Sequence, residues 1–434
     1  MNIVDLIIKK RNGGELTTDE INYFIKGVTD KSLPDYQISA MLMAIFFRSL
    51  SPQETADLTL AMVHSGTTLD LSEINGIKVD KHSTGGVADT TTLILAPLVA
   101  SLGLKVIKMS GRGLGHSGGT IDKLESIPGY NTNLSTQQAI KQVNDIGLAI
   151  IGQTSDLTPA DKYLYALRDV TGTVDSIPLI ASSIISKKLA GGSDAIVLDV
   201  KVGNGAFMQD ITQARQLAKA MVEIGNSLNK KTVALITAMD RPLGNNIGNS
   251  LEVEEAINVL KGKVKGRLKD VVLELGAHML VLGKITNNLE TARNMLNENI
   301  ANGKGLDKFK ELITAQGGNP HVCDDLSLLP QPTEKFTVTA KKSGIISQMD
   351  TAKIGRASVA LGAGRTYKGE KIDLSAGIIM NKTVSDVVQQ GDKIAELYSS
   401  DIDKCNIAAD ILNESIEISN VEKKPLPTIL EVIE

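Results

Sequence analysis

The fold of this chain is decided by residues 77–109, which read IKVDKHSTGGVADTTTLILAPLVASLGLKVIKM. We expect a strand at 77–79, a glycine-rich loop, a helix at 90–102 and a second strand at 105–109. A strand, a helix and a strand at this spacing are typical of a right-handed parallel βαβ unit. This stretch therefore predicts an α/β domain with parallel strands.

The sequence that follows extends the same pattern. Residues 195–202 and 232–237 are β-branched, almost continuous apolar runs, which suit strands buried on both faces. We expect helices at 211–228 and 251–260, between or after these strands. The middle of the chain is therefore predicted to form a mainly parallel sheet covered by helices.

Helical sequence lies on either side of the first βαβ unit. In residues 1–70 we expect four short helices, and Thr17 and Ser51 each begin a capping box that opens an apolar-periodic stretch. Residues 159–192 are also helical in pattern. We expect them to pack onto the first 70 residues and to form one discontinuous helical domain.

The composition changes at 330–334, where a Pro-rich segment is typical of a linker. Short β-like runs with frequent glycines follow. Two of these pieces are similar to swinging-arm carrier domains, but a carrier needs a lysine at a tight turn and residues 348–350 (Gln-Met-Asp) contain none. We therefore predict a small helical domain (1–70 plus about 159–192), a large α/β domain (about 71–158 plus 193–329) and a C-terminal α+β domain (335–434).

Charge and composition exclude several classes of protein. The 434 residues contain 46 Lys plus Arg and 50 Asp plus Glu, so the net charge of -4 gives no sign of a nucleic-acid or membrane-surface binder. Cys323 and Cys405 form no CxxC pair, which indicates a reducing compartment without a zinc or redox motif. The start of the chain does not read as a secretory signal, and no apolar run is long enough to span a membrane. We expect a cytoplasmic protein.

The loop after the first strand has the composition of an anion site. Gly85 and Gly86 let the backbone approach a ligand closely, and the following helix offers free N–H groups at its N-terminus. Lys81 adds a full positive charge, and Ser83 and Thr92 add hydroxyl donors. Together these groups suit a phosphate dianion, although a glycine-rich turn with solvated polar residues remains the alternative.

The loop after the second strand, residues 110–120, reads SGRGLGHSGGT and contains a GxGxxG match at 113–118. That pattern alone is weak evidence for a nicotinamide dehydrogenase, because positions 133–140 hold no acidic residue for the ribose. Neither loop matches the GxxxxGK[ST] pattern of a P-loop NTPase. Since loops at the carboxyl ends of parallel strands converge on one crevice, both loops are expected to face the same ligand.

Three polar residues stand out in the second helical segment. Ser183 and Lys187 are four residues apart and therefore share one helix face. Arg168 lies near the end of the preceding helix, and Asp161, seven residues earlier, is a candidate bridge between the helical and α/β parts. Each of these residues taken alone would most simply be a solvated surface group.

The two loops carry a family resemblance. Residues 110–129, SGRGLGHSGGTIDKLESIPG, together with Lys81-His-Ser-Thr-Gly-Gly-Val87, closely resemble the signature of the thymidine and pyrimidine-nucleoside phosphorylase family, and the similarity covers essentially the whole chain. The resemblance implies a homodimer that splits uridine, deoxyuridine and thymidine into free base and pentose 1-phosphate. Inorganic phosphate is the implied co-substrate, without an organic cofactor. Phosphate is expected on the α/β side, base on the helical side, and domain closure between them.

The resemblance also implies roles for individual residues. The phosphate site would comprise the first-loop groups and their neighbours, namely Lys81, Ser83, Gly85, Gly86, Thr92, Lys108, Ser110 and Thr120. The nucleoside site would comprise His82, Lys108, Arg168, Ser183 and Lys187, of which His82, Arg168 and Lys187 are the expected catalytic residues. His116, in the second loop, is expected only to shape that loop. A lysine at 108 goes with the broad-specificity members, because an ammonium can hydrogen-bond a ribose 2′-hydroxyl.

A potassium site is a further implication of the resemblance. Its expected ligands are Ala88, Thr90, Leu243, Asn246 and Glu255. Ala88 stands where glycine is common and Asn246 where alanine can stand. Both changes are tolerable if backbone carbonyls bind the ion.

Two other functions compete with phosphorolysis. The first is the activity of anthranilate phosphoribosyltransferase, an enzyme that is similar in fold and binds a phosphorylated ribose. The Lys81-His82-Ser83 run and the helical set of Arg168 and its partners argue against it. The second is a non-catalytic nucleoside or phosphate sensor, which the full set of polar site residues disfavours.

Overall fold

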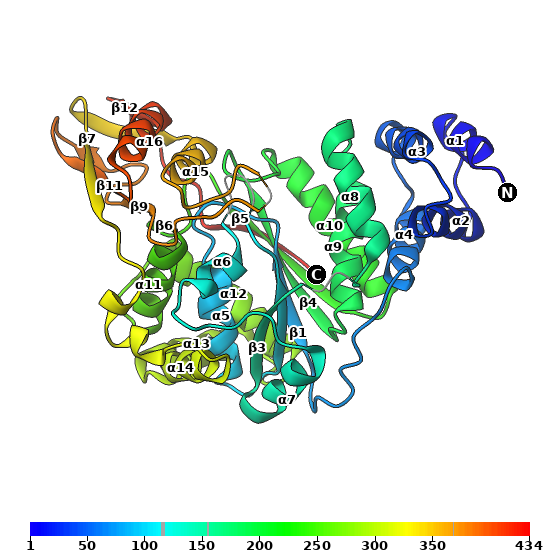
Figure 1. Ribbon diagram of the computed structural model, residues 1–434, viewed down its shortest axis with the longest axis horizontal. Coiled ribbons are helices and arrows are strands. Elements are labelled where there is room, and N and C mark those ends of the chain that lie inside the picture. The colour runs from blue at the N-terminus through cyan, green and yellow to red at the C-terminus, as the bar shows by residue number, and fades with distance from the viewer. Residues whose placement is uncertain (114–117, 154–155, 368) are drawn as a thin grey trace.

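The structure, a computed structural model, describes residues 1–113, 118–153, 156–367 and 369–434. Its centre is a twisted sheet in which β1 (Val79–Ser83), β4 (Ala195–Val202) and β5 (Lys231–Ala238) run parallel (Figure 1). A parallel pair, β2 (Val106–Ser110) and β3 (Leu148–Gly152), continues the sheet beyond β1 through a bridge between Lys78 and Lys105. The expected mainly parallel sheet is confirmed.

Helices cover both faces of this sheet, and strand β4 explains why. Ala195 and Val197 belong to the core beneath one helical layer, whereas Ile196, Leu198 and Val200 pack under the other. Successive side chains of a strand point to opposite faces, so an unbroken apolar run needs cover on both sides. One layer comprises α5 (Thr91–Ala100), α11 (Asn249–Leu260), α12 (Arg267–Leu282), α13 (Leu289–Ala301) and α14 (Lys304–Ala315), and the other α9 (Ile177–Ala190) and α10 (Ile211–Ser227). Two shorter helices, α6 (Thr120–Glu125) and α7 (Thr136–Ile146), flank β2 and β3 in sequence.

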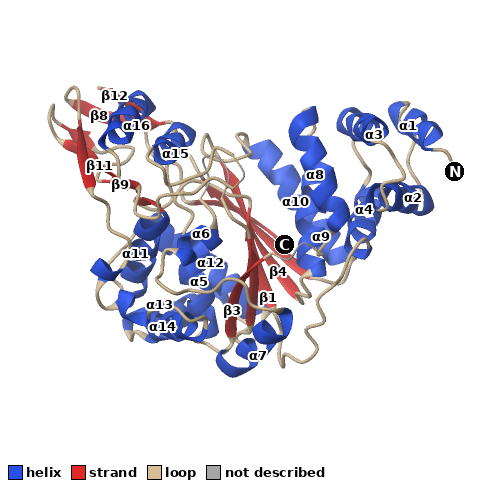
Figure 2. Cartoon of the chain, viewed as in Figure 1, coloured by secondary structure: helices blue, strands red, loops and turns tan. Residues whose placement is uncertain are grey.

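The N-terminal end of the molecule is helical, with four helices where four were expected. They are α1 (Ile3–Arg11), α2 (Thr18–Thr29), α3 (Asp35–Arg48) and α4 (Pro52–His64), and both expected capping boxes are present at Thr17 and Ser51. Ala160 and Leu164 of α8 (Pro159–Thr171) lie in the same hydrophobic core as these helices. Two segments that are far apart in sequence therefore pack together at this end (Figure 2).

The C-terminal module combines two antiparallel sheets with two helices. Strand pairing connects it to the central part of the molecule in two places. Its elements are β7 (Glu334–Thr339), β8 (Gly344–Met349), α15 (Thr351–Ala360), β9 (Gly377–Met380), β10 (Val387–Val388), β11 (Lys393–Ser399), α16 (Ile402–Ser415) and β12 (Ile416–Ser419). Strand β6 (Asn246–Gly248) joins this module by pairing with β9. In the other direction β13 (Ile429–Ile433), inside the range 335–434, pairs with β5 of the central sheet.

The first strand lies further along the chain than its hydrophobicity predicts. We expected it at 77–79, but β1 begins at Val79 and ends at Ser83, so Lys81, His82 and Ser83 belong to the strand and not to the loop. The apolar pattern stops at Val79, yet pairing with β4 continues from Val79 opposite Ala195 to the pair of Ser83 and Asp199. Backbone pairing thus carries four polar residues, Asp80 to Ser83, into the sheet.

Among the described residues, no helix has both the length and the apolar character that crossing a bilayer requires. Cys323 and Cys405 are both buried as free thiols. The expected cytoplasmic location stays a prediction.

Candidate active site

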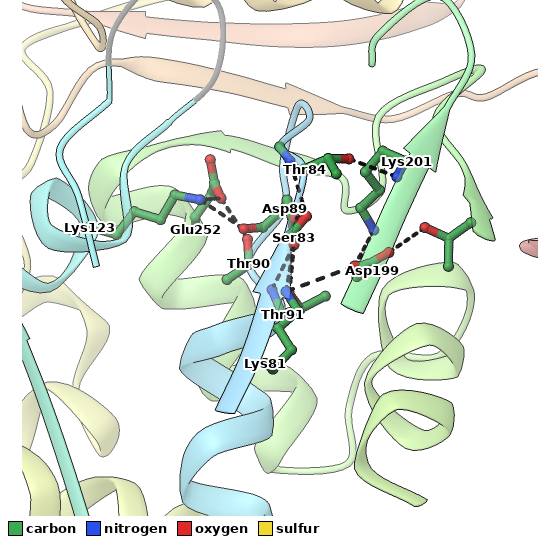
Figure 3. Close-up of polar contacts among 12 residues, drawn as sticks. Lys81, Ser83, Thr84, Asp89, Thr90, Thr91, Lys123, Asp199, Lys201 and Glu252 are labelled. Atoms are coloured by element: carbon green, nitrogen blue, oxygen red, sulfur yellow. Dashed lines mark hydrogen bonds and ion pairs between the residues drawn. The ribbon is translucent and has the colours of Figure 1, made fainter. Parts of the chain in front are cut away.

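Lys81 lies at the centre of a buried polar cluster at the carboxyl end of β1 (Figure 3). Its ammonium donates to the Thr91 hydroxyl and lies 4.0 Å from Asp89 Oδ1 and 3.8 Å from Asp199 Oδ2. Burial lowers the pKa of Lys81, and the two carboxylates oppose that effect. Asp199 is itself paired with Lys201 at 2.7 Å. The site therefore contains a cation whose position is fixed from two sides.

Asp89 organises the hydroxyl groups around this cation. The Ser83 hydroxyl donates to Asp89 Oδ2 and the Thr91 hydroxyl donates to Asp89 Oδ1, both at 2.6 Å. Burial alone would raise the pKa of Asp89, but Lys81 and these donors hold that pKa far below its ordinary value. We call Lys81, Ser83, Asp89 and Thr91 the β1–α5 cluster. Thr92, the expected phosphate ligand, lies one position further along α5.

The two positions of the first loop that hold glycine require it for different structural reasons. Gly85 has φ +93°, a conformation that glycine adopts without strain, and its N–H donates to the Ser83 hydroxyl at 3.2 Å. At Gly86 a Cβ would lie 2.4 Å from Cε of Met239. Gly86 is thus required by packing, and Gly85 by the turn.

The second loop is held by a carboxylate at the start of α6. Asp122 accepts the N–H of Gly113 at 2.8 Å and two hydrogen bonds, each of 2.8 Å, from Arg365 of the C-terminal module. Ser110 is buried at the end of β2, and Thr120 is the first residue of α6. His116 and residues 114–117 as a whole lie outside the described residues.

Lys108 joins the two strands that carry the loops. Its ammonium donates to the carbonyl oxygen of Lys81 at 2.8 Å and lies 3.2 Å from Asp80. Asp80 also accepts a hydrogen bond of 2.8 Å from Lys188 of helix α9. Burial lowers the pKa of Lys108 to about 7, although Asp80 raises it. Asp80 therefore connects the sheet to the helical layer through two lysines.

A cavity of about 440 Å³, the α8–α9 cavity, opens beside these lysines. The Lys187 ammonium at its wall is 2.5 Å from Asp161 and donates to the Ser183 hydroxyl at 2.8 Å. Asp161 of α8 thus orients Lys187 of α9, a helix that covers one face of the sheet. The cavity is lined by Met109, Gln153, Leu157, Thr158, Asp161, Lys162, Tyr165, Lys187 and Lys188.

Arg168 lies behind this wall. Its guanidinium donates to the carbonyl oxygens of Thr173 at 3.2 Å, Leu179 at 3.1 Å and Val174 at 2.6 Å. In the described part of the chain the lining of the α8–α9 cavity includes Lys187 but not Arg168. Three of the five N–H groups of this guanidinium therefore donate to backbone carbonyl oxygens.

His82 directly follows Lys81 in β1, and its side chain is half-buried. Its pKa is well below the ordinary value, because the ring is partly removed from water and because four ammonium groups act on it, in decreasing order those of Lys188, Lys108, Lys187 and Lys81. Two of these lysines line the cavity, and another belongs to the cluster. The imidazole is therefore neutral near pH 7.

Most of the expected potassium ligands meet at one turn. The Ala88 carbonyl accepts the N–H of Gly244 at 3.3 Å, next to Leu243, and the Glu255 carboxylate accepts the N–H of Asn246 at 3.3 Å. The Thr90 hydroxyl points instead to Glu252, at 2.6 Å. Burial, with Glu252 nearby, raises the pKa of Glu255 to about 7. Among the described residues no cationic side chain forms an ion pair with Glu255, so this buried carboxylate fits a monovalent cation.

Several organising residues were not singled out from the sequence. Asp80, Asp89, Thr91 and Lys188 act through contacts with residues on other elements. The one local signal was Asp89-x-Thr91, an acidic residue just before a helix, which is typical of capping.

Three family models match the chain, in the order of its structural parts. Residues 4–66 match the helical bundle domain of a glycosyl transferase family, and residues 75–306 match the a/b domain of that family. Residues 345–419 match the pyrimidine nucleoside phosphorylase C-terminal domain. Fold and site therefore define a glycosyl transferase.

Similarity to curated relatives identifies a narrower family within the glycosyl transferases. The chain is 55% identical over 425 residues to a pyrimidine-nucleoside phosphorylase of Bacillus subtilis, covering 98% of each chain. It is 55% identical over 400 residues to that of Geobacillus stearothermophilus, covering 92% of each. The chain belongs to the pyrimidine-nucleoside phosphorylase family. Anthranilate phosphoribosyltransferase from Thermus thermophilus shares the fold, with a TM-score of 0.59 at 18% identity over 71% of this chain and 98% of that one.

The contact between Asp161 and Lys187 leads to a first prediction. Asp161→Asn keeps the shape of the side chain but removes the charge that orients Lys187. We expect kcat/KM for the nucleoside to fall about tenfold, while KM for phosphate stays within about twofold, because the ion pair with Lys187 is lost only on the helical side. Steady-state kinetics with each substrate varied in turn measure both quantities.

Asp169→Asn, an exposed change on the same helix, is the matched control and is expected to behave as the wild type. Equal losses in both KM values for Asp161→Asn would contradict a role confined to Lys187.

Proposed function

We propose that this chain catalyses the phosphorolysis of pyrimidine nucleosides to free base and pentose 1-phosphate. The observation that carries the proposal is the chain of contacts that links the two parts of the site. Lys108 donates to the carbonyl oxygen of Lys81 and pairs with Asp80, and Asp80 accepts a hydrogen bond from Lys188, which lines the α8–α9 cavity. An anion site and a base site of this kind are adjacent, as a direct transfer between them requires. The relatives named above have the same activity in their names.

Phosphate is proposed to bind at the carboxyl ends of β1 and β2. Lys81 supplies a fixed positive charge, and Ser83, Ser110 and Thr120 supply hydroxyl groups around it, with the N-terminus of α5 adding backbone donors. Holding phosphate in line with C1′ of the pentose contributes several kcal/mol, because the reacting atoms are positioned before the bond changes. No covalent intermediate with the enzyme is needed.

The pyrimidine is proposed to bind in the α8–α9 cavity. As the bond from C1′ to the base nitrogen breaks, negative charge develops on the base. Lys187, oriented by Asp161 and Ser183, and the guanidinium of Arg168 stabilise that charge. Donors aimed in this way contribute roughly 3–4 kcal/mol each.

His82 is proposed to donate a proton or a hydrogen bond to the leaving base. Its imidazole is neutral in the unliganded protein because of burial and the nearby lysines. A phosphate dianion bound beside it would oppose those lysines and raise its pKa toward the working range of a general acid.

The two competing functions are less well supported. The similarity to anthranilate phosphoribosyltransferase, at 18% identity, concerns the fold alone. Two relatives with the phosphorylase name match nearly the whole chain at about three times that identity. A non-catalytic sensor would not need Lys187 held by Asp161 at the base side, since its ligands only have to bind.

The decisive test is a turnover panel with purified protein. We expect phosphate-dependent release of base from uridine, deoxyuridine and thymidine, followed by absorbance, and no consumption of anthranilate with phosphoribosyl pyrophosphate. Lys81→Ala and Arg168→Ala are each expected to lower kcat/KM by at least about 10²-fold, as for loss of a transition-state donor. Activity near that of the wild type in either variant would show that its role is wrongly assigned.

Lys108 is proposed to recognise the sugar. Its ammonium is fixed by Asp80 and the Lys81 carbonyl at the end of the strand that leads into the second loop. From this position it can donate to a ribose 2′-hydroxyl, which a deoxyribose lacks. We therefore propose that ribonucleosides and deoxyribonucleosides are both accepted.

Lys108→Met is expected to lower kcat/KM for uridine about tenfold more than that for thymidine, because a thioether is only a weak acceptor for the 2′-hydroxyl. Deoxyuridine is the matched control, since it differs from uridine only in that hydroxyl and should follow thymidine. An unchanged ratio of uridine to deoxyuridine would reject this role.

A potassium ion is proposed to bind at Glu255, with carbonyl oxygens of Ala88, Thr90, Leu243 and Asn246 as further ligands. The support is the raised pKa of the buried carboxylate, which lacks a cationic partner among the described residues. The ion would supply that positive charge and fix the end of the first loop. It takes no part in the bond changes.

The pKa of Glu255 sets the sign of the next prediction. Because it is about 7 when folded against an ordinary 4.5, folding takes up a proton between these values and stability falls as pH rises through them. Bound potassium offsets this loss. We expect KCl in place of tetramethylammonium chloride to raise Tm at about pH 8 more than at about pH 6, and Glu255→Gln to abolish the difference. Equal effects of both salts on the wild type would reject the site.

A homodimer and a discontinuous helical domain complete the proposal. Phe47 of α3 is 76% exposed and lines an open groove with Met43 and Ala44 of α3 and Ile7 of α1, an apolar surface suited to a second copy. The proposed domain boundaries are 1–70 plus 159–192, 71–158 plus 193–329, and 335–434, and the shared core of α1–α4 with α8 supports the first of these domains. Closure of the helical part onto the sheet would exclude water, which competes with phosphate as the nucleophile.

A further inference from the structure

Asp89 occupies the place that an oxyanion would take among the donors of the β1–α5 cluster. Its Oδ2 accepts from Ser83 and its Oδ1 from Thr91, both at 2.6 Å, and the ammonium of Lys81 lies 4.0 Å from Oδ1. These are groups of the kind that bind phosphate. Figure 3 shows the hydroxyls and the ammonium turned toward this carboxylate.

The carboxylate can only accept hydrogen bonds. Both of its oxygens already accept a hydrogen bond from a hydroxyl group, and the ammonium of Lys81 lies beside it, so it acts as an ionised acceptor. Its side chain is only 10% exposed, so water screens it little. An oxyanion that offers acceptors alone is therefore opposed here, whereas one that carries a proton finds an acceptor.

The hydroxyl of Ser83 makes this selection sharper, because it has one proton to donate. In the unliganded protein that proton goes to Asp89 Oδ2. If Ser83 turns to a bound oxyanion, Asp89 needs a replacement donor. Inorganic phosphate near neutral pH always carries a P–OH group that can provide it, but sulfate carries none.

We propose that Asp89 is a specificity-determining residue that selects protonated oxyanions, phosphate and arsenate, over sulfate. On binding, the Ser83 O–H transfers its hydrogen bond from Asp89 to an oxygen of the ligand, and the ligand O–H donates to Asp89 in its place. Asp89 accepts the same number of hydrogen bonds before and after binding, and no covalent bond changes. This inference rests on the proposed function, because it takes the β1–α5 cluster as the phosphate site.

A purely structural role for Asp89 makes a different prediction. Asp89 Oδ1 accepts the N–H of Thr91 at 3.3 Å, as a capping residue would. Asn caps helices about as well as Asp, so Asp89→Asn keeps the cap and removes only the negative charge. If capping were its whole role, oxyanion selectivity would not change.

The test is calorimetric titration of the full-length protein with phosphate, arsenate, sulfate and fluorophosphate, without nucleoside. Fluorophosphate is a dianion of phosphate-like shape in which fluorine replaces the hydroxyl. For the wild type we expect sulfate and fluorophosphate to bind at least about tenfold more weakly than phosphate, because each leaves a buried acceptor unpaired, with arsenate close to phosphate. In Asp89→Asn we expect the ratio of phosphate affinity to sulfate affinity to fall about tenfold, since the amide N–H can donate to sulfate.

Asp210→Asn is the matched control, because Asp210 caps α10 by accepting the N–H of Thr212 at 2.6 Å and stands outside the cluster. It should keep the wild-type ratio. An unchanged ratio in Asp89→Asn would overturn the proposal. A wild type that binds phosphate and fluorophosphate equally would also overturn it, and that result does not depend on the stability of the variant. A protein that selects among oxyanions but turns over no nucleoside would contradict the proposed function and leave the role of Asp89 standing.

Discussion

Burial of the Lys81 ammonium is the constraint on which the arrangement of the site depends. A cation removed from water needs anionic partners at close range, and the chain provides Asp89 from the first loop and Asp199 from β4. Asp199 in turn forms an ion pair with Lys201 at 2.7 Å and accepts a hydrogen bond from the Thr237 hydroxyl at 2.6 Å. The electrostatic requirement of one residue thus extends over three parallel strands, and their register is tied to the chemistry at their ends.

The same principle joins parts of the molecule that have separate hydrophobic cores. Asp80 contacts Lys108 of β2 and Lys188 of α9, so a single carboxylate connects both loop-bearing strands to the helical layer. On the opposite side, Asp122 receives Arg365 from the C-terminal module and the backbone of Gly113 from the second loop. The loops that carry the chemistry are therefore short spans between rigid elements, each anchored by a buried charge.

The sequence predicted the features that depend on local pattern. The parallel sheet, the four N-terminal helices and their caps follow from hydrophobic period and helix-start signals. It placed β1 too early, because pairing with β4 continues through polar residues where the apolar signal stops. It also missed Asp80 and Lys188, whose meaning comes only from contact between residues 108 positions apart in the chain. Motif and resemblance thus named the candidate site residues, whose roles stay predictions, whereas the groups that orient them required the fold.

The return of β13 to the central sheet has a consequence for how the molecule is made. Strand β5 is complete once residue 238 has been synthesised, but its outer edge stays unpaired until residues 429–433 have left the ribosome. An uncovered edge of this apolar strand is a template for pairing with other chains. The C-terminal strand, fastened by Glu431 to Arg215 of α10 at 2.9 Å, is therefore a late closing step in biogenesis, and nascent chains that stall before it are the species most exposed to aggregation.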